Sequence, residues 1–379
     1  MGDFVDPTPS TLVDAVLFIS FLDLSPLSTL LRSFYREPYK IRHPPEAMLR
    51  LFALQKLRGH KFLTELDREL DERAVKLLGF KYKPSYKTLW HWLNKRVGPQ
   101  GLQAIHTELM KIINQALATR GIQMASTVAG DATHIQAKPQ DNEAGYSGHY
   151  KMRCYLLHHL ICATTGLTLN WLVAPGNVDE GMFMLPMLAK AFADGFKPLL
   201  LVLDNGYAHY FNYEIPNLLG IRLLIGFRKK KNKFSWRGKP RTLKLRFRKM
   251  IKAGKLTLQK LAELHMDPDL GKNTLEDVVC ALAIVGEHKY AGAYYRNKSL
   301  AWFRRDRKGW MALFAPARSF IEGTHGHMKD WLGLGDFAER GLRKVRMHVG
   351  LCMLCEAAVA LTRVQHGFTD SLTSCAYMR

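Results

Sequence analysis

The chain is poor in cysteine and in acidic residues. Six cysteines are scattered over 379 residues, which argues against a disulfide-rich scaffold. Asp and Glu number 33 against 55 Lys and Arg, so the formal net charge is +22. A surplus of this size favours a polyanionic partner, because phosphates release condensed counterions when cations bind them. Charge alone leaves DNA, RNA and an anionic membrane surface open.

A secretory leader and a long apolar run are also lacking. The first ten residues, MGDFVDPTPS, are acidic and have neither a basic n-region nor an apolar h-region, so we expect no signal peptide. The most apolar stretch, residues 154–174, contains His158, His159 and Gly166. A membrane span would contain few polar residues of this kind. We expect two buried strands around Gly166 there, no membrane partner, and a cytoplasmic protein.

Helical patterning dominates the first part of the chain. Apolar residues recur at helical spacing in two runs before residue 121, which predicts a helical domain over residues 1–121. A short helix, a turn near residues 79–84 and a second helix capped by Ser85 fit a helix-turn-helix. A purely structural helix pair stays an alternative. The candidate DNA-binding residues of the second helix and its continuation are Lys87, Lys95 and Arg96.

After residue 121 the pattern changes to alternating strands and helices. This alternation predicts an α/β core with a mixed sheet, whose first part covers residues 122–227. The expected elements are strands at residues 126–132, 199–203 and 221–227, a polar loop at 139–149, a helix at 181–193 and a helix after Gly206.

A basic run interrupts this core. Residues 228–260 hold 15 Lys and Arg and no Asp or Glu. So many uncompensated cations predict contact with phosphates, although a solvated loop is the plainer interpretation. We expect an insertion over residues 228–308, with strands at 278–303. The residues of the run that we single out for DNA contact are Arg228, Lys229, Lys230 and Lys231.

The last part of the chain, residues 309–379, is expected to be helical. The helical pattern begins near Pro316 and reaches Gln365, and we expect its last long helix to cover the sheet. Cys352 and Cys355 form a CxxC inside this pattern, but without a second pair they are interpreted as small core residues.

Three acids occupy positions that suit a metal site. Asp131 follows an apolar segment at a strand edge, Asp204 ends the strand LLLVL, and Glu322 lies on an expected helix. Two carboxylates at strand ends can face one cleft, and a helix beside the sheet can add the third. Carboxylate oxygens suit Mg²⁺ or Mn²⁺, and two such ions can promote in-line displacement at phosphorus. Each acid taken singly is more often a turn former or a helix cap.

The order of these motifs resembles the prokaryotic insertion-sequence DDE transposases, which have a ribonuclease-H-like catalytic core. The resemblance covers most of the chain outside residues 228–308. It is carried by HPPEAMLRLFALQKLRGHKFLTELDRELDE at residues 43–72, GDATHI at 130–135, the hairpin and "pGN…D" turn at 148–188, LVLDNGYAH at 201–209, and Arg318, Glu322 and Lys329, which fit the R-x3-E-x6-K part of the Y-R-E-K signature.

The resemblance implies roles for these residues. Asp131, Asp204 and Glu322 would be the metal ligands, and Arg318 and Lys329 would bind DNA phosphates near the cut end. The Tyr of the signature would fall at Ala315, so its contact is missing or comes from another residue. Further candidates from the residues themselves, each with a plain structural alternative, are Lys151 for DNA contact, His325 and His327 near the phosphate, and Trp302 for stacking on an unpaired base.

These observations together predict a transposase that binds double-stranded DNA, namely the terminal inverted repeats of an element and its target. It would cleave with two Mg²⁺ or Mn²⁺ ions and then join strands. Cutting and joining two ends suggests a homodimer in the DNA complex. A metal-dependent nuclease that does not join strands, a DNA-binding protein derived from an inactive transposase, and an RNA-binding protein remain the alternatives.

Overall fold

The contacts between residues divide the chain into two compact units. The first comprises Met1–Gln123, Ile135–Ala144 and Thr324–Arg379, and the second comprises Met124–His134 and Gly145–Gly323. The four domains predicted from the sequence stay a prediction. The computed structural model describes residues 12–35, 41–209, 212–213, 216, 219–227 and 291–374.

The first unit is helical in its described residues apart from residues 135–136, at the end of strand β1 (Thr127–Gln136), and its N-terminal region is helical as predicted. Ser85 caps α6 as expected, because its Oγ accepts a hydrogen bond from the backbone nitrogen of Thr88 at 3.3 Å. A π-helix, Trp92–Val97, continues directly from α6. The α-helices are α1 (Leu12–Ser20), α2 (Ser28–Ser33), α3 (Pro45–Leu57), α4 (Leu63–Glu69), α5 (Glu72–Leu77), α6 (Tyr86–His91), α7 (Gly98–Ala118) and α15 (Leu342–Gln365).

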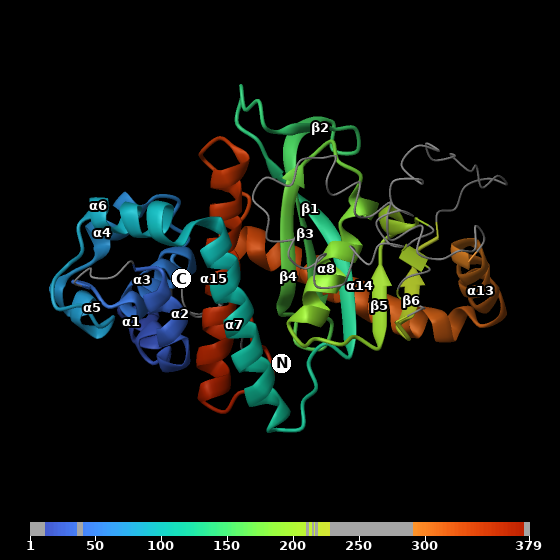
Figure 1. Ribbon diagram of the computed structural model, residues 1–379, viewed down its shortest axis with the longest axis horizontal. Coiled ribbons are helices and arrows are strands. Elements are labelled where there is room, and N and C mark those ends of the chain that lie inside the picture. The colour runs from blue at the N-terminus through green and yellow to red at the C-terminus, as the bar shows by residue number, and fades with distance from the viewer. Residues whose placement is uncertain are drawn as a thin grey trace, which may run out of the picture. The chain divides into compact units, whose positions relative to one another are not determined.

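The long helix α15 packs against α7 and α3 (Figure 1). The sequence predicted the sheet as its partner; within its own unit the partners of this helix are other helices. Its residues are buried on nearly every side from Val345 to Val364, which is the pattern of a helix surrounded by other helices. Gly350 permits the close approach, because a Cβ there would lie 2.9 Å from a side-chain atom of Leu102 on α7.

By length and composition alone, α15 could cross a membrane, and so could the bent pair formed by α1 and residues 25–33. However, 89% of the apolar window of α15 is buried inside the protein. Burial of this kind is typical of the core helix of a soluble protein. Cys352 and Cys355 are buried core positions of this helix, and among the described residues no cluster of His, Cys, Asp and Glu could hold a metal ion.

The second unit is built on a mixed sheet, as predicted (Figure 1). Its order is β2-β3-β1-β5-β6, and β4 pairs with β3. The β3 strand is antiparallel to β2 and β4, whereas β5 is parallel to both β1 and β6. This mixed sheet flanked by helices is the ribonuclease-H-like arrangement. The strands are β1 (Thr127–Gln136), β2 (Gly145–Ser147), β3 (Met152–Cys162), β4 (Thr168–Pro175), β5 (Leu200–Leu203) and β6 (Arg222–Ile225).

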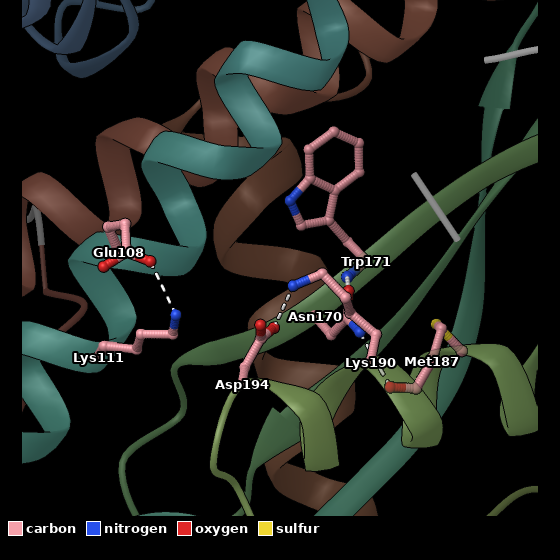
Figure 2. Close-up of polar contacts among 7 residues, drawn as sticks. All are labelled: Glu108, Lys111, Asn170, Trp171, Met187, Lys190 and Asp194. Carbon is pink, nitrogen blue, oxygen red and sulfur yellow. Dashed lines mark hydrogen bonds and ion pairs between the residues drawn. The ribbon is translucent and has the colours of Figure 1, made fainter. Parts of the chain in front are cut away.

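Helices pack on both faces of this sheet (Figure 1). Helix α8 (Met184–Ala193) lies in front and contacts β3 and β4. Asn170 of β4 ties the two layers together, because its Nδ2 donates to the carbonyl of Met187 on α8 at 2.9 Å (Figure 2). Lys190 and Asp194 form an ion pair near the end of the same helix, also drawn in Figure 2.

The opposite face is covered by α14 (Arg307–Trp331). Aromatic and aliphatic side chains interdigitate there into one core, in which Trp310 is only 2% exposed. Removing such a side chain costs about 3–5 kcal/mol, which shows how firmly the helix is fixed to the sheet. The buried members of this core cluster are Ala129, Ile161, Ala163, Leu200, Val202, Leu224, Trp310, Ala317 and Ile321.

Three local predictions need correction. Strands were expected at residues 278–303. Residues 278–290 lie outside the described residues, whereas 291–303 lie in helix α13 (Ala291–Arg305), where Trp302 and Phe303 pack against the core cluster. Packing here overrides the strand preference of the aromatic residues. The expected loop at 139–149 contains the short strand β2. By contrast, the helix expected after Gly206 is supported: after a 3-10 turn at Asn205–Tyr207, residues 212, 213 and 216 are helical, and residues 210–211, 214–215 and 217–218 lie outside the described residues.

The third correction concerns Pro316. Helix α14 does not begin near it but contains it. A proline inside a helix removes one backbone hydrogen bond and crowds the carbonyl four residues earlier. The helix continues because Trp310 before the proline and Ile321 after it are anchored in the same core cluster.

Candidate active site

The sheet itself brings the first two acids together. β1 and β5 are parallel, and their register pairs Gly130 with Leu203. The residues that follow are Asp131, still within β1, and Asp204, directly after the end of β5. Gly130 allows this packing, because a Cβ there would lie 2.6 Å from the Leu203 side chain and 3.0 Å from that of Leu160. Asp131 lies inside β1 rather than at the strand edge that the sequence predicted.

The third acid comes from α14. Successive side chains of a strand point to opposite faces of the sheet, so Asp131 points to the same face as Ala129. Ala129 packs in the core cluster with residues of α14. Arg318 and Glu322 lie one helical turn apart on that helix. Arg318 donates from Nη1 to Oδ2 of Asp131 at 2.8 Å and from Nη2 to Oε1 of Glu322 at 3.1 Å. One guanidinium thus joins two of the three predicted acids.

Burial differs greatly between these acids. The side chain of Asp131 is 15% exposed and that of Glu322 is 65% exposed. Burial raises the pKa of Asp131 more than Arg318 lowers it, and the charge of Asp204 raises it further. Burial alone would lower the pKa of Arg318, but Asp131, Asp204 and Glu322 together raise it. Three carboxylates therefore act on one cation.

This donor set fits a hard divalent cation. Carboxylate oxygens are the ligands that Mg²⁺ and Mn²⁺ prefer, and an excess of negative charge favours a cation of higher valence. As Arg318 now stands between Asp131 and Glu322, the three acids do not form a ready ligand cluster, and none was found among the described residues. A metal ion would replace Arg318 as the partner of the buried carboxylate.

Two tyrosines and a fourth acid near this site were missed in the sequence. Burial and then the charges of Glu180 and Asp131 raise the pKa of Tyr150 to about 12. Burial, then Asp131, Glu180 and Asp204, raise the pKa of the fully buried Tyr207 well above its usual value. Both phenols therefore keep their protons at neutral pH. The signal for Tyr207 was its place in the segment LVLDNGYAH.

The position of Glu180 depends on a glycine. Its carboxylate oxygen lies 2.5 Å from where a Cβ of Gly206 would be, so only glycine fits two residues after Asp204 without a shift. Tyr207 is the next residue, and its hydroxyl lies 3.3 Å from Nδ1 of His158. Burial lowers the pKa of His158 to about 3, so this ring is neutral. The side chains of Tyr150, Tyr207 and His158 are therefore uncharged at neutral pH.

The other candidates from the sequence are spread over the molecule. Lys151 is exposed beside Tyr150 and has a φ of 54°. Lys87 and Lys95 are exposed on or just after α6, whereas the guanidinium of Arg96 lies 4.4 Å from the ring centre of Tyr35. The four basic residues at 228–231 lie outside the described residues.

The remaining candidates lie on α13 and α14. Trp302 packs partly against the core cluster, and the guanidinium of Arg222 lies 4.6 Å from its ring centre. His325, His327 and Lys329 lie beyond Gly323, in the part of α14 that belongs to the first unit. All three are partly exposed, and burial lowers the pKa of Lys329.

Comparison with known proteins identifies the family. A search of the curated proteins found no match, and a search of the solved structures found none either. The family model of the transposase DDE domain matches residues 123–355. This match contains Asp131, Asp204 and Glu322 and covers more than half of the chain, and the chain therefore belongs to the DDE transposase family.

Proposed function

We propose that this chain cleaves DNA strands at the ends of an insertion sequence and transfers the resulting 3′-hydroxyl to target DNA. The observation that carries the proposal is the β1–β5 register, which makes Asp131 and Asp204 neighbours on the side where Arg318 joins Asp131 to Glu322. Membership of the DDE transposase family supports the same reaction class.

The three acids would hold two Mg²⁺ or Mn²⁺ ions. When bound, such ions would activate a water or a 3′-hydroxyl and stabilise the leaving oxygen. The guanidinium of Arg318 would then be available for a DNA phosphate, and bidentate contact with phosphate is a common use of arginine. Tyr150 and Tyr207 stay neutral, so they can donate hydrogen bonds without adding negative charge.

Double-stranded DNA is the proposed partner, in the form of terminal inverted repeats and target. The net charge of +22 supports a polyanion, and Lys87, Lys95, Arg96, Lys151 and Lys329 are the candidates for phosphate contact in the described residues. A homodimer in the DNA complex would hold both ends of the element. We place this activity in the cytoplasm of a prokaryote, at the nucleoid.

Calorimetric titration of Mn²⁺ into the full chain with duplex DNA tests the metal site. We expect the wild type to bind Mn²⁺, and Asp131→Asn, Asp204→Asn and Glu322→Gln each to weaken that binding at least tenfold, about 1.4 kcal/mol. Glu108→Gln is the matched control, because Glu108 is an exposed acid paired with Lys111 at 2.8 Å on α7 (Figure 2). Unaltered binding in all three variants contradicts the site.

A strand-transfer assay separates the proposed reaction from its alternatives. Given pre-cut ends that carry a 3′-hydroxyl, the wild type should join them to a second duplex, and Asp204→Asn should not. Cleavage without joined product would indicate a nuclease. DNA binding without metal-dependent cleavage would indicate a DNA-binding protein derived from an inactive transposase.

A further inference from the structure

A basic groove lies at the edge of the sheet, and none of the three acids lines it. Strand β6 is the last strand in the order of the described sheet, and α13 lies beside it (Figure 1). A groove of about 620 Å³ is lined by residues of both elements. The polar and aromatic residues that line it are Tyr213, Arg222, Lys298, Ser299, Trp302 and Arg305.

Arg222 is held in position in this groove. Its guanidinium lies 4.6 Å from the ring centre of Trp302, and Trp302 is itself packed against the core cluster. A cation over an aromatic face is attracted by the ring, and the contact limits the rotamers that the arginine can adopt. Lys298 and Arg305 are exposed at the same groove, so three cations face one space.

Ser299 is the second, independent sign of a ligand. It is 9% exposed, and its buried Oγ has no hydrogen-bond partner in the described structure. A serine inside a helix commonly donates to the carbonyl four residues earlier, but this one does not. An unsatisfied buried hydroxyl is costly, and an acceptor in the groove would satisfy it.

We propose that this groove binds a backbone phosphate of DNA. The proposal rests on the proposed transposase function, which supplies the DNA. Phosphate oxygens accept from guanidinium, ammonium and hydroxyl groups alike. Lys298, Arg305 and Arg222 neutralise the charge, Ser299 donates a hydrogen bond, and Trp302 is a positioning residue that keeps Arg222 in place. The groove thereby holds a stretch of DNA outside the segment that is cut.

The test is the salt dependence of DNA binding by the full chain, measured by fluorescence anisotropy with a labelled duplex. Loss of one phosphate contact makes the slope of log K for DNA binding against log salt less negative by about 0.9. We expect this change in the double variant Lys298→Ala/Arg305→Ala. Arg304→Ala is the matched control, because Arg304 is an exposed cation on the same helix and does not line the groove.

Ser299→Ala separates a role in DNA binding from a role in stability. We expect DNA binding about tenfold weaker, since hydrogen bonds to charged groups are strong, and a midpoint of urea unfolding that is unchanged or higher, since an unpaired hydroxyl is removed. If the wild type binds DNA and every groove variant behaves as Arg304→Ala does, the groove proposal is overturned and the proposed function stands. If the wild type itself binds no DNA, both are overturned.

Discussion

Removing the guanidinium of Arg318 should weaken the fold in a pH-dependent way. Arg318 donates to Asp131 at 2.8 Å and to Glu322 at 3.1 Å, but the two ends of this bridge differ in exposure. The Asp131 side chain is 15% exposed, and that of Glu322 is 65% exposed. Arg318→Ala therefore leaves one carboxylate buried without its cation and the other in water.

The size of the loss in stability depends mainly on Asp131, the buried acid of the pair. Breaking a buried ion pair from one side costs about 3–5 kcal/mol, and losing an exposed pair costs about 0–1 kcal/mol. Because Asp131 keeps some solvent contact, we expect the free energy of unfolding to fall by about 2–3 kcal/mol at pH 8. Burial already raises the pKa of Asp131, and loss of Arg318 raises it further.

The sign of the pH dependence is set by that pKa. The loss in the free energy of unfolding is largest above the pKa that Asp131 has in the variant. It becomes smaller as the pH falls through that pKa, because a protonated carboxyl needs no cation. If Mn²⁺ binds as proposed, a concentration about a hundredfold over its Kd should restore about 2.7 kcal/mol, since a ligand that binds only the folded state stabilises it.

Urea unfolding of the wild type, Arg318→Ala and Glu322→Gln at pH 8 and pH 5 measures these effects. Glu322→Gln is the control for the exposed end and should cost about 0–1 kcal/mol. In an Asp131→Asn background, Arg318→Ala should cost less than it does in the wild type, because the neutral amide needs no cation. Equal losses at both pH values and in both backgrounds would refute the reasoning.

Three further predictions concern the stability of the fold. Asn170→Ala should lower the free energy of unfolding by about 1–3 kcal/mol in urea, because the carbonyl of Met187 loses its buried partner; an unchanged midpoint would contradict this. Burial lowers the pKa of His158 to about 3. This group therefore leaves the free energy of unfolding unchanged above pH 6.5 and lowers it by about 1.4 kcal/mol per pH unit between pH 6.5 and 3. His158→Gln should remove that slope, and parallel pH profiles of the two proteins would disprove it. Ser85→Ala should cost about 1 kcal/mol in thermal unfolding, and Ser85→Asp should retain the cap; equal losses would count against capping.

Patterns within short segments predicted the fold best. The strand LLLVL and the acid after it, the hairpin around Gly166 and the cap at Ser85 all arise from local chemistry, and the structure contains each of them. The acids at 131 and 204 were predicted as a pair because strand ends meet, and the register of β1 and β5 makes them neighbours. Their role as metal ligands stays a prediction.

Long-range packing was not predictable from the same patterns. The apolar pattern of α15 is compatible with a sheet or with helices as its partner, and only the complete fold selects α3 and α7. Tyrosines at 294 and 295 favour a strand locally, yet the chain is helical there. Tyr150 and Glu180 lie inside the segment at 148–188 that carries the family resemblance, but the local pattern gave no reason to single them out as neighbours of the acids.

Because Trp310 anchors α14 in the core cluster, residues can hardly be inserted into or deleted from the helix between Trp310 and Glu322. An α-helix turns by about 100° per residue, so one residue inserted between Trp310 and Arg318 would rotate Arg318 and Glu322 away from Asp131 while leaving the helix itself intact. A single in-frame codon gained or lost in this stretch should therefore inactivate the site as thoroughly as a substitution of Asp131. We expect the spacing from Trp310 to Glu322 to be as restricted as the identities of the acids themselves.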